Sequence, residues 1–163
     1  MMIERIETEA ERLLAEANVR SVPVPIEEVA RHLRISISRA PSADFSGLLI
    51  RKEGRALIGV NSSEAPMRQR FTIAHELGHY VLHPRKDAFV DFRKDRAATE
   101  LRPPRERQAD MFAAALLMPR SQLLKDIRKL AKDGVTETVT DTLAVRYGVS
   151  KEAMRIRLIN LLR

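Results

Sequence analysis

The sequence predicts an α+β fold in which a small antiparallel sheet packs on a helical core. Apolar residues recur at helical spacing up to residue 33, short alternating segments follow over about 35–61, and helical patterns resume from about residue 64. At 163 residues the chain has the length of one domain, so we expect a single domain over 1–163. Hydrophobic residues make up 44% and charged residues 31%, the balance of an ordinary globular domain.

Two helices are predicted before the sheet. The first carries apolar residues three or four positions apart: Ile3, Ile6, Ala10, Leu13, Leu14 and Ala17. The Pro-Val-Pro run at 23–25 ends it, and a second helix is expected over 26–33.

The predicted sheet covers about 35–61. Residues 35–38 alternate as a strand, and 47–50 and 56–60 flank a turn at 52–54, which is typical of a hairpin. We expect 56–60 to form an exposed edge strand that could pair with an extended peptide.

Further helices are expected over about 64–83 and 103–118, and C-terminal helices over about 121–163. Between the first two, the polar segment 85–102 is expected to be an exposed connection with a short strand at 88–90. Ser121 is the expected cap of the first C-terminal helix, and the last two helices form a hairpin.

The composition excludes several classes of function. The chain has no Cys, so it has no disulfide, no thiolate zinc site and no cysteine nucleophile, and any transition metal would bind His and carboxylates. Only 4% of the residues are aromatic, which argues against a stacking platform for single-stranded nucleic acid. The acidic N-terminus is unlike a signal peptide, and no apolar run reaches the roughly 20 residues of a membrane span, so we expect a cytoplasmic protein. The net charge of +7 is read as a solvated basic surface.

Residues 75–79 read His-Glu-Leu-Gly-His, an HExxH pattern inside a predicted helix. Residues four apart lie on one helix face, so His75 and His79 can bind a single metal ion. Glu76 projects beside that face, toward a metal-bound water. The pattern therefore predicts metal-dependent hydrolysis.

A catalytic zinc site needs a third protein ligand. A third His ten residues after the first is excluded, because position 85 is Arg, and His83 lies about 12 Å along the helix axis from His75, so it is expected to be structural. Glu106 is the candidate ligand, with Asp110 one turn later placed to accept a hydrogen bond from a ligating imidazole. Glu106 is equally well explained as an acidic residue in a first helical turn. Asp110 decides between the two interpretations, because an unpaired carboxylate in that apolar stretch would be costly.

Two segments resemble the ImmA/IrrE metallopeptidases: RQRFTIAHELGHY at 68–80 and ERQADMFAAALLMP at 106–119. The likeness extends over nearly the whole chain and implies a minimal gluzincin with a zincin-like fold. By position, the residues that match the family's site are His75, His79 and Glu106 as zinc ligands, Glu76 as general base and Asp110 behind the ligands.

The resemblance also implies a substrate. Such peptidases carry out limited proteolysis of helix-turn-helix transcriptional repressors and so switch on gene expression, which makes the expected partner a protein rather than a membrane or a nucleic acid. Tyr80, Tyr147 and His83 are the side chains available to stabilise an oxyanion, and no spacing argument selects one of them.

Two other functions compete with proteolysis. Residues 143–158 are similar to a DNA-binding helix-turn-helix with Arg155 and Arg157 on the second helix, although the apolar content of that helix favours a structural hairpin. The second alternative is a catalytically weak protein that binds a regulator, against which the intact Glu76 argues.

Overall fold

The computed structural model describes residues 1–92 and 102–163, so part of the predicted connection at 85–102 lies outside the described residues. Within them, seven helices and four strands confirm the predicted α+β class. In chain order they are α1 (Met2–Glu16), α2 (Ile26–His32), β1 (Ile35–Ala40), β2 (Phe45–Lys52), β3 (Arg55–Asn61), α3 (Pro66–Leu82), β4 (Ala88–Phe92), α4 (Pro104–Leu117), α5 (Arg120–Leu130), α6 (Glu137–Tyr147) and α7 (Lys151–Leu162). In the described part of the chain, no helix combines the length and apolar character that crossing a bilayer requires.

The four strands form one sheet in the order β1-β3-β2-β4. Strand β2 pairs antiparallel with β3 and β4, whereas β1 pairs parallel with β3, so the sheet is mixed rather than wholly antiparallel as predicted. Strand β3 lies inside the sheet, and the expectation that 56–60 forms an exposed edge is wrong. The two edges among the described strands are β1 and β4.

A buried asparagine lies at the end of the parallel pair. Asn61, at the end of β3, receives a hydrogen bond from the Ser42 amide at 3.0 Å and donates one to the Ser42 carbonyl at 2.8 Å. These bonds hold the loop after β1 against the end of β3. Strand β1 lies on one side of β3, and β2 lies on the other side, joined to β3 by the hairpin.

The predicted hairpin turn is confirmed. Lys52 and Arg55 form the last cross-strand pair, and the two residues between them have left-handed backbones, with φ of 53° at Glu53 and 73° at Gly54. Positive φ at both central residues is the geometry that joins two strands without splaying them, and Gly adopts it at no steric cost.

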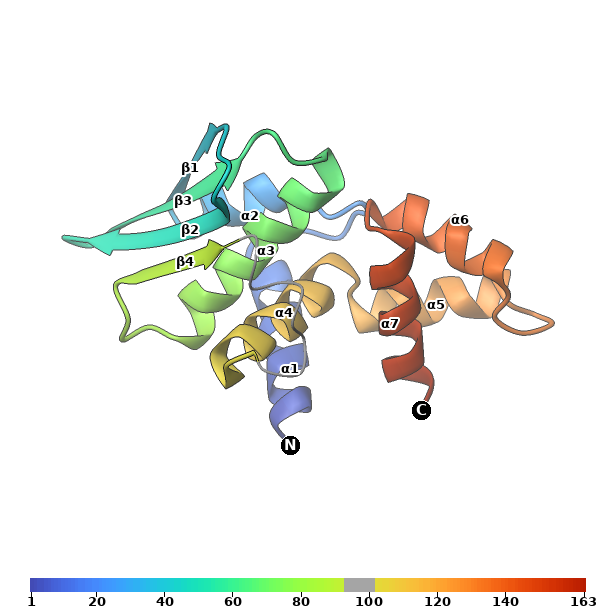
Figure 1. The fold of residues 1–163 in the computed structure, drawn as a ribbon. Helices are drawn as coiled ribbons and strands as arrows, with labels where there is room; N and C mark the ends of the chain where they lie inside the picture. Colours follow the sequence, from blue (N-terminus) through green and yellow to red (C-terminus); the bar gives the residue numbers. More distant parts are fainter. Residues whose placement is uncertain (93–101) are drawn as a thin grey trace.

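One face of the sheet packs on α3, and α4 and α1 lie beyond α3 on the same side (Figure 1). The core joins strand residues Leu49 and Ile58 to Ile73 and Leu77 of α3 and Leu116 of α4, all of them fully buried. Because α3 lies between the sheet and α4, its polar residues can face both.

Helices α5, α6 and α7 form a group at the C-terminal side of the molecule (Figure 1). Helix α5 begins at Arg120 after Pro119, and Ser121 lies inside its first turn, where its amide donates to Glu11. The prediction that Ser121 caps α5 is therefore wrong. The predicted helical hairpin is confirmed, with Gly148 in the left-handed conformation between α6 and α7.

Candidate metal centre

His75 and His79 lie one turn apart in the buried part of α3. Their Nε2 atoms are 3.1 Å from each other, and both side chains are shielded from solvent, with exposures of 0% and 1%. The helix begins at Pro66, which suits a first helical position because it lacks an amide hydrogen. The Nε2 atoms of His75 and His79 therefore face a common point, as their spacing predicts.

Glu106 reaches the same point from the first turn of α4. Its Oε2 atom is 3.1 Å from His75 Nε2, and its Oε1 atom is 3.1 Å from His79 Nε2. The close approach of the two helices depends on Gly78, where a Cβ would meet the Ala109 carbonyl oxygen of α4 at 3.0 Å. A larger residue there would hold α4, and with it Glu106, away from the imidazoles.

The donor set fits a zinc ion. Among the described residues, His75, His79 and Glu106 form a group whose ligand atoms lie close enough to share one cation. Ligands at the usual zinc bond lengths around a tetrahedral ion are about 3.3 Å apart. The separations of 3.1 Å in this cluster are within a few tenths of an ångström of that value.

Asp110 stands behind His75. Its Oδ1 atom is 2.8 Å from His75 Nδ1, which leaves Nε2 as the ring nitrogen that faces Glu106 and His79. Arg102, which precedes α4, contacts Asp110 Oδ2 and lies 3.4 Å from Glu106 Oε2. The sequence pattern did not select Arg102, since nothing local shows that it folds back onto carboxylates four and eight residues later.

His83 occupies the corresponding place behind His79. Its Nδ1 atom is 3.0 Å from His79 Nδ1, and its Nε2 atom is 2.8 Å from Gln108 Oε1. The Phe89 ring of β4 stacks on His79 with the ring centroids 3.9 Å apart. As predicted, His83 is not a member of the three-residue group, but it touches one of its members.

Burial and hydrogen bonding act in opposite directions on the titratable groups. Burial lowers the pKa of His75, but hydrogen bonds to Asp110 and Glu106 outweigh it and raise this pKa to about 10. Burial keeps the pKa of His79 below its usual value. Burial would also raise the pKa of Glu106, but its contacts with the two imidazoles hold that pKa well below its ordinary range. The carboxylates of Asp110 and Glu106 thus favour positive charge on His75, whereas burial disfavours it on His79.

Glu76 lies on the sheet side of the cluster and is fully buried. Its Oε1 atom is 3.3 Å from the position that a Cβ on Gly47 of β2 would take. Ligand atoms of His75, Glu76 and the buried Asp91 of β4 also lie within 4.8 Å of one another. The structure thus brings a second carboxylate, which the sequence reasoning did not single out, next to the predicted general base.

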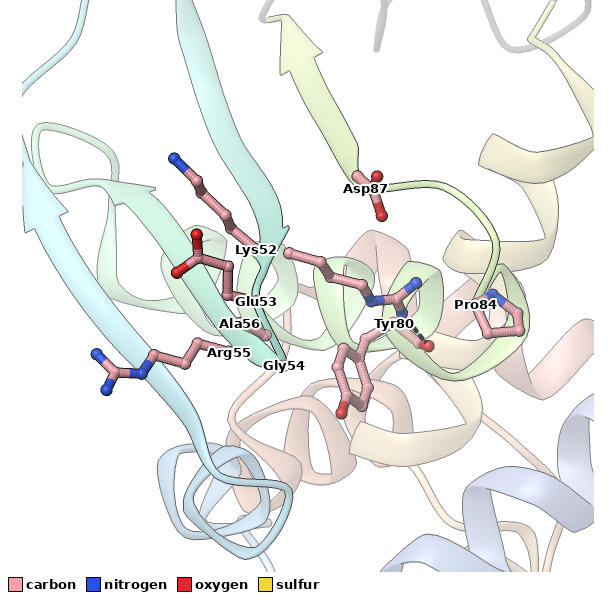
Figure 2. A pocket seen from close by; sticks show the side chains of 9 residues that line it. Lys52, Glu53, Gly54, Arg55, Ala56, Tyr80, Pro84 and Asp87 are labelled. Atoms are coloured by element: carbon pink, nitrogen blue, oxygen red, sulfur yellow. Dashed lines mark hydrogen bonds between the residues drawn. The ribbon is translucent and has the colours of Figure 1, made fainter.

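The three oxyanion candidates all have other contacts. Tyr147 is buried and donates its hydroxyl to Asp126 at 2.7 Å, and His83 is held between His79 and Gln108. Tyr80 lines a pocket of about 570 Å³ at the hairpin end of the sheet, and the Arg51 guanidinium lies 4.5 Å from its ring centroid. Figure 2 shows Tyr80 between the hairpin turn and Pro84.

The C-terminal hairpin uses its basic residues for internal contacts. Arg157 is 5% exposed, pairs with Glu7 of α1 and donates to the Met118 carbonyl oxygen at 2.9 Å. Arg155 is exposed and lies 3.2 Å from Glu137. Arg157 is therefore unable to contact a DNA phosphate in this conformation, which removes one of the two residues on which the DNA-binding hypothesis depended.

Comparison with known proteins agrees with this site. Residues 30–159 match the family model described as the IrrE N-terminal-like domain. The chain is 37% identical over 94 residues to the radiation response metalloprotease IrrE of Deinococcus deserti, covering 58% of this chain and 32% of IrrE. It is 30% identical over 93 residues to the metallopeptidase ImmA of Bacillus subtilis, covering 57% of this chain and 53% of ImmA. The matches thus span about a third and about half of these relatives.

A solved structure shares the fold. A Mycobacterium tuberculosis transcriptional regulator superposes with a TM-score of 0.68 at 20% identity, over 98% of this chain and 48% of that protein. The family model covers most of the chain, including His75, His79 and Glu106. The chain therefore belongs to the IrrE N-terminal-like domain family of metallopeptidases.

Proposed function

We propose that this protein is a zinc-dependent endopeptidase that performs limited proteolysis of a protein substrate. The observation that carries the proposal is the convergence of His75, His79 and Glu106 from two helices onto one point. The two Nε2 atoms are 3.1 Å apart, and each lies 3.1 Å from one oxygen of the Glu106 carboxylate. Metalloproteases among the relatives support it. When bound, zinc would supply Lewis acidity and lower the pKa of a coordinated water to about 7.

Glu76 would move the protons of the reaction. It follows His75 in the same helix turn, and its carboxylate is buried against β2 at Gly47, which restricts its rotamers. We propose that one carboxylate oxygen of Glu76 accepts the proton of the attacking water and then delivers it to the departing amine nitrogen. Asp110 and Arg102 would hold His75 and Glu106 in place meanwhile.

Strand β4 would bind the substrate backbone. It pairs with β2 on one side and is an edge strand among the described residues. Its Phe89 and Asp91 side chains are buried toward α3, with Phe89 stacked on His79, so a peptide paired to β4 would run past the metal cluster. Main-chain pairing of this kind binds an extended segment with little sequence preference. We therefore propose β4, and not 56–60, as the edge strand that pairs with the substrate peptide.

The substrate that we propose is a helix-turn-helix repressor, cleaved at an exposed linker to release gene expression. The support for this is the family resemblance of the two segments that form the metal centre. A dedicated partner also suits a backbone-pairing site, because selectivity must then come from a contact away from the paired strand.

The test compares wild type with Glu76→Gln after co-expression with candidate repressors, with fragments mapped by mass spectrometry. We expect one cut in one repressor with wild type and none with Glu76→Gln, which should keep its zinc because Glu76 is outside the His75, His79 and Glu106 group. Cleavage by Glu76→Gln at the wild-type rate would reject Glu76 as the base. Equal digestion of casein and of every repressor would reject the dedicated partner and leave the peptidase proposal standing.

A further inference from the structure

We propose that His83 and Gln108 are a positioning pair that fixes the tautomer of His79 and so directs its Nε2 lone pair at the metal. The inference rests on the proposed metal site. It gives a function to a histidine that the sequence pattern marked as structural.

The side-chain amide of Gln108 sets the direction of the chain of hydrogen bonds. Its Nε2 atom lies 3.2 Å from the sulfur of Met2, and its Oε1 atom lies 2.8 Å from His83 Nε2. A thioether sulfur only accepts hydrogen bonds, so the amide nitrogen faces Met2 and the amide oxygen faces His83. A His83 ring that carries its hydrogen on Nε2 can then donate it to Gln108.

That assignment determines the state of His79. With its hydrogen on Nε2, a neutral His83 has a lone pair on Nδ1, which lies 3.0 Å from His79 Nδ1. His79 then donates its Nδ1 hydrogen to His83. The lone pair of His79 is left on Nε2, the atom that lies 3.1 Å from both His75 Nε2 and Glu106 Oε1.

The two ligating histidines are thus held by different chemistry. His75 Nδ1 faces a carboxylate oxygen of Asp110, whereas His79 Nδ1 faces the imidazole of His83. Phe89 completes the support of His79, since its ring lies nearly parallel to the imidazole at 15° and limits rotation. Hydrogen-bond partners behind a ligand commonly change metal affinity 10–100-fold when they are removed.

Two substitutions separate positioning from packing. In His83→Asn the side-chain oxygen can take the place of Nδ1 and accept from His79, while the contact with Gln108 is lost. In His83→Gln the terminal amide can take the place of Nε2 and keep the contact with Gln108, while the acceptor near His79 is lost. Gln fills more of the histidine volume than Asn. If His83 served only to fill space, His83→Gln would therefore keep more of the zinc affinity than His83→Asn. His32→Ala, an exposed histidine at the end of α2, is the matched control.

The measurement is the zinc dissociation constant, obtained by competition with a chromophoric chelator, together with the visible spectrum of the Co²⁺-substituted protein. We expect His83→Asn to bind zinc within about 3-fold of wild type, and His83→Gln and His83→Ala to bind it about 10–100-fold more weakly with an altered Co²⁺ spectrum. Gln108→Leu should weaken zinc about 10-fold, because His83 is then free to present its other tautomer. Urea unfolding of each variant checks that the fold is retained.

If His83→Gln bound zinc as tightly as His83→Asn or more tightly, the inference would be overturned and the metal site would be left intact. Unchanged zinc affinity in all three His83 variants would have the same consequence. Failure of the wild type to bind zinc, or binding that survives His79→Ala at full affinity, would overturn the proposed metal site and this inference with it.

Discussion

Gly78 sets the distance between the two helices that build the metal centre, so Gly78→Ala should damage both stability and metal binding. The added Cβ would lie 3.0 Å from the carbonyl oxygen and 3.1 Å from the Cα of Ala109. Ordinary contacts of this kind are about 3.5 Å, and backbone atoms of a packed helix cannot rotate away, so α4 must move by about 0.5 Å. Overpacking of this kind costs about 1–3 kcal/mol, against a gain of about 1 kcal/mol from replacing a helical Gly.

We therefore expect the free energy of unfolding of Gly78→Ala to fall by about 1 kcal/mol. Zinc affinity should fall about 10-fold, because a site tolerates displacements of only about 0.5 Å and Glu106 moves with α4. Urea unfolding and chelator competition measure the two quantities. Gly59→Ala is the control, because the three atoms nearest its Cβ would all belong to the Leu48 side chain, which can move. A gain in stability with unchanged zinc affinity would refute the reasoning.

Three further perturbations test the account. Asp110→Ala should weaken zinc about 10–100-fold in chelator competition, and an unchanged affinity would reduce Asp110 to a packing residue. In Gly47→Ala the new Cβ would lie 2.3 Å from Thr72 Cγ2, so stability should fall by about 1–3 kcal/mol in urea unfolding, and a stable variant would show that β2 and α3 can separate at no cost. Burial would raise the pKa of Asp126, but hydrogen bonds, above all the one from Arg146, hold this pKa below the ordinary 3.8. The ionised Asp126 carboxylate therefore stabilises the fold above that pH, and this stabilisation is lost as the pH falls. Asp126→Asn should lower stability by about 1–3 kcal/mol at pH 7, and the deficit should shrink in unfolding curves recorded below about pH 4; a deficit that does not change with pH would contradict this.

The sequence predicts those features that depend on near neighbours. The helical spacing of His75 and His79 and the turn at Gly54 follow from local periodicity and backbone preference, and the structure agrees with both. Glu106 could be predicted as the candidate third ligand because a zinc site of this kind needs three protein ligands. The parallel pairing of β1 with β3 and the hydrogen bonds of Asn61 to a loop 19 residues away join distant segments, and no local pattern shows such contacts.

Asp110 was predicted behind the ligands, but the other residues that surround them were not. Arg102, Phe89 and Asp91 approach the cluster only because α3, α4 and β4 meet there. His83 was recognised as too distant to share the ion, yet its actual partner, Gln108, belongs to another helix. Sequence spacing excluded His83 as a ligand along one helix, but it did not identify Gln108 as the residue of a second helix that contacts His83.

The most direct test of the central claim is the zinc content of purified protein, measured by mass spectrometry of the metal after dialysis against a weak chelator. We expect one zinc per wild-type chain and essentially none in Glu106→Ala, because Glu106 supplies the oxygen that closes the three-residue group. Glu28→Ala, an exposed acid in the first turn of α2, should keep full zinc as the control. Full zinc occupancy in Glu106→Ala would contradict the account.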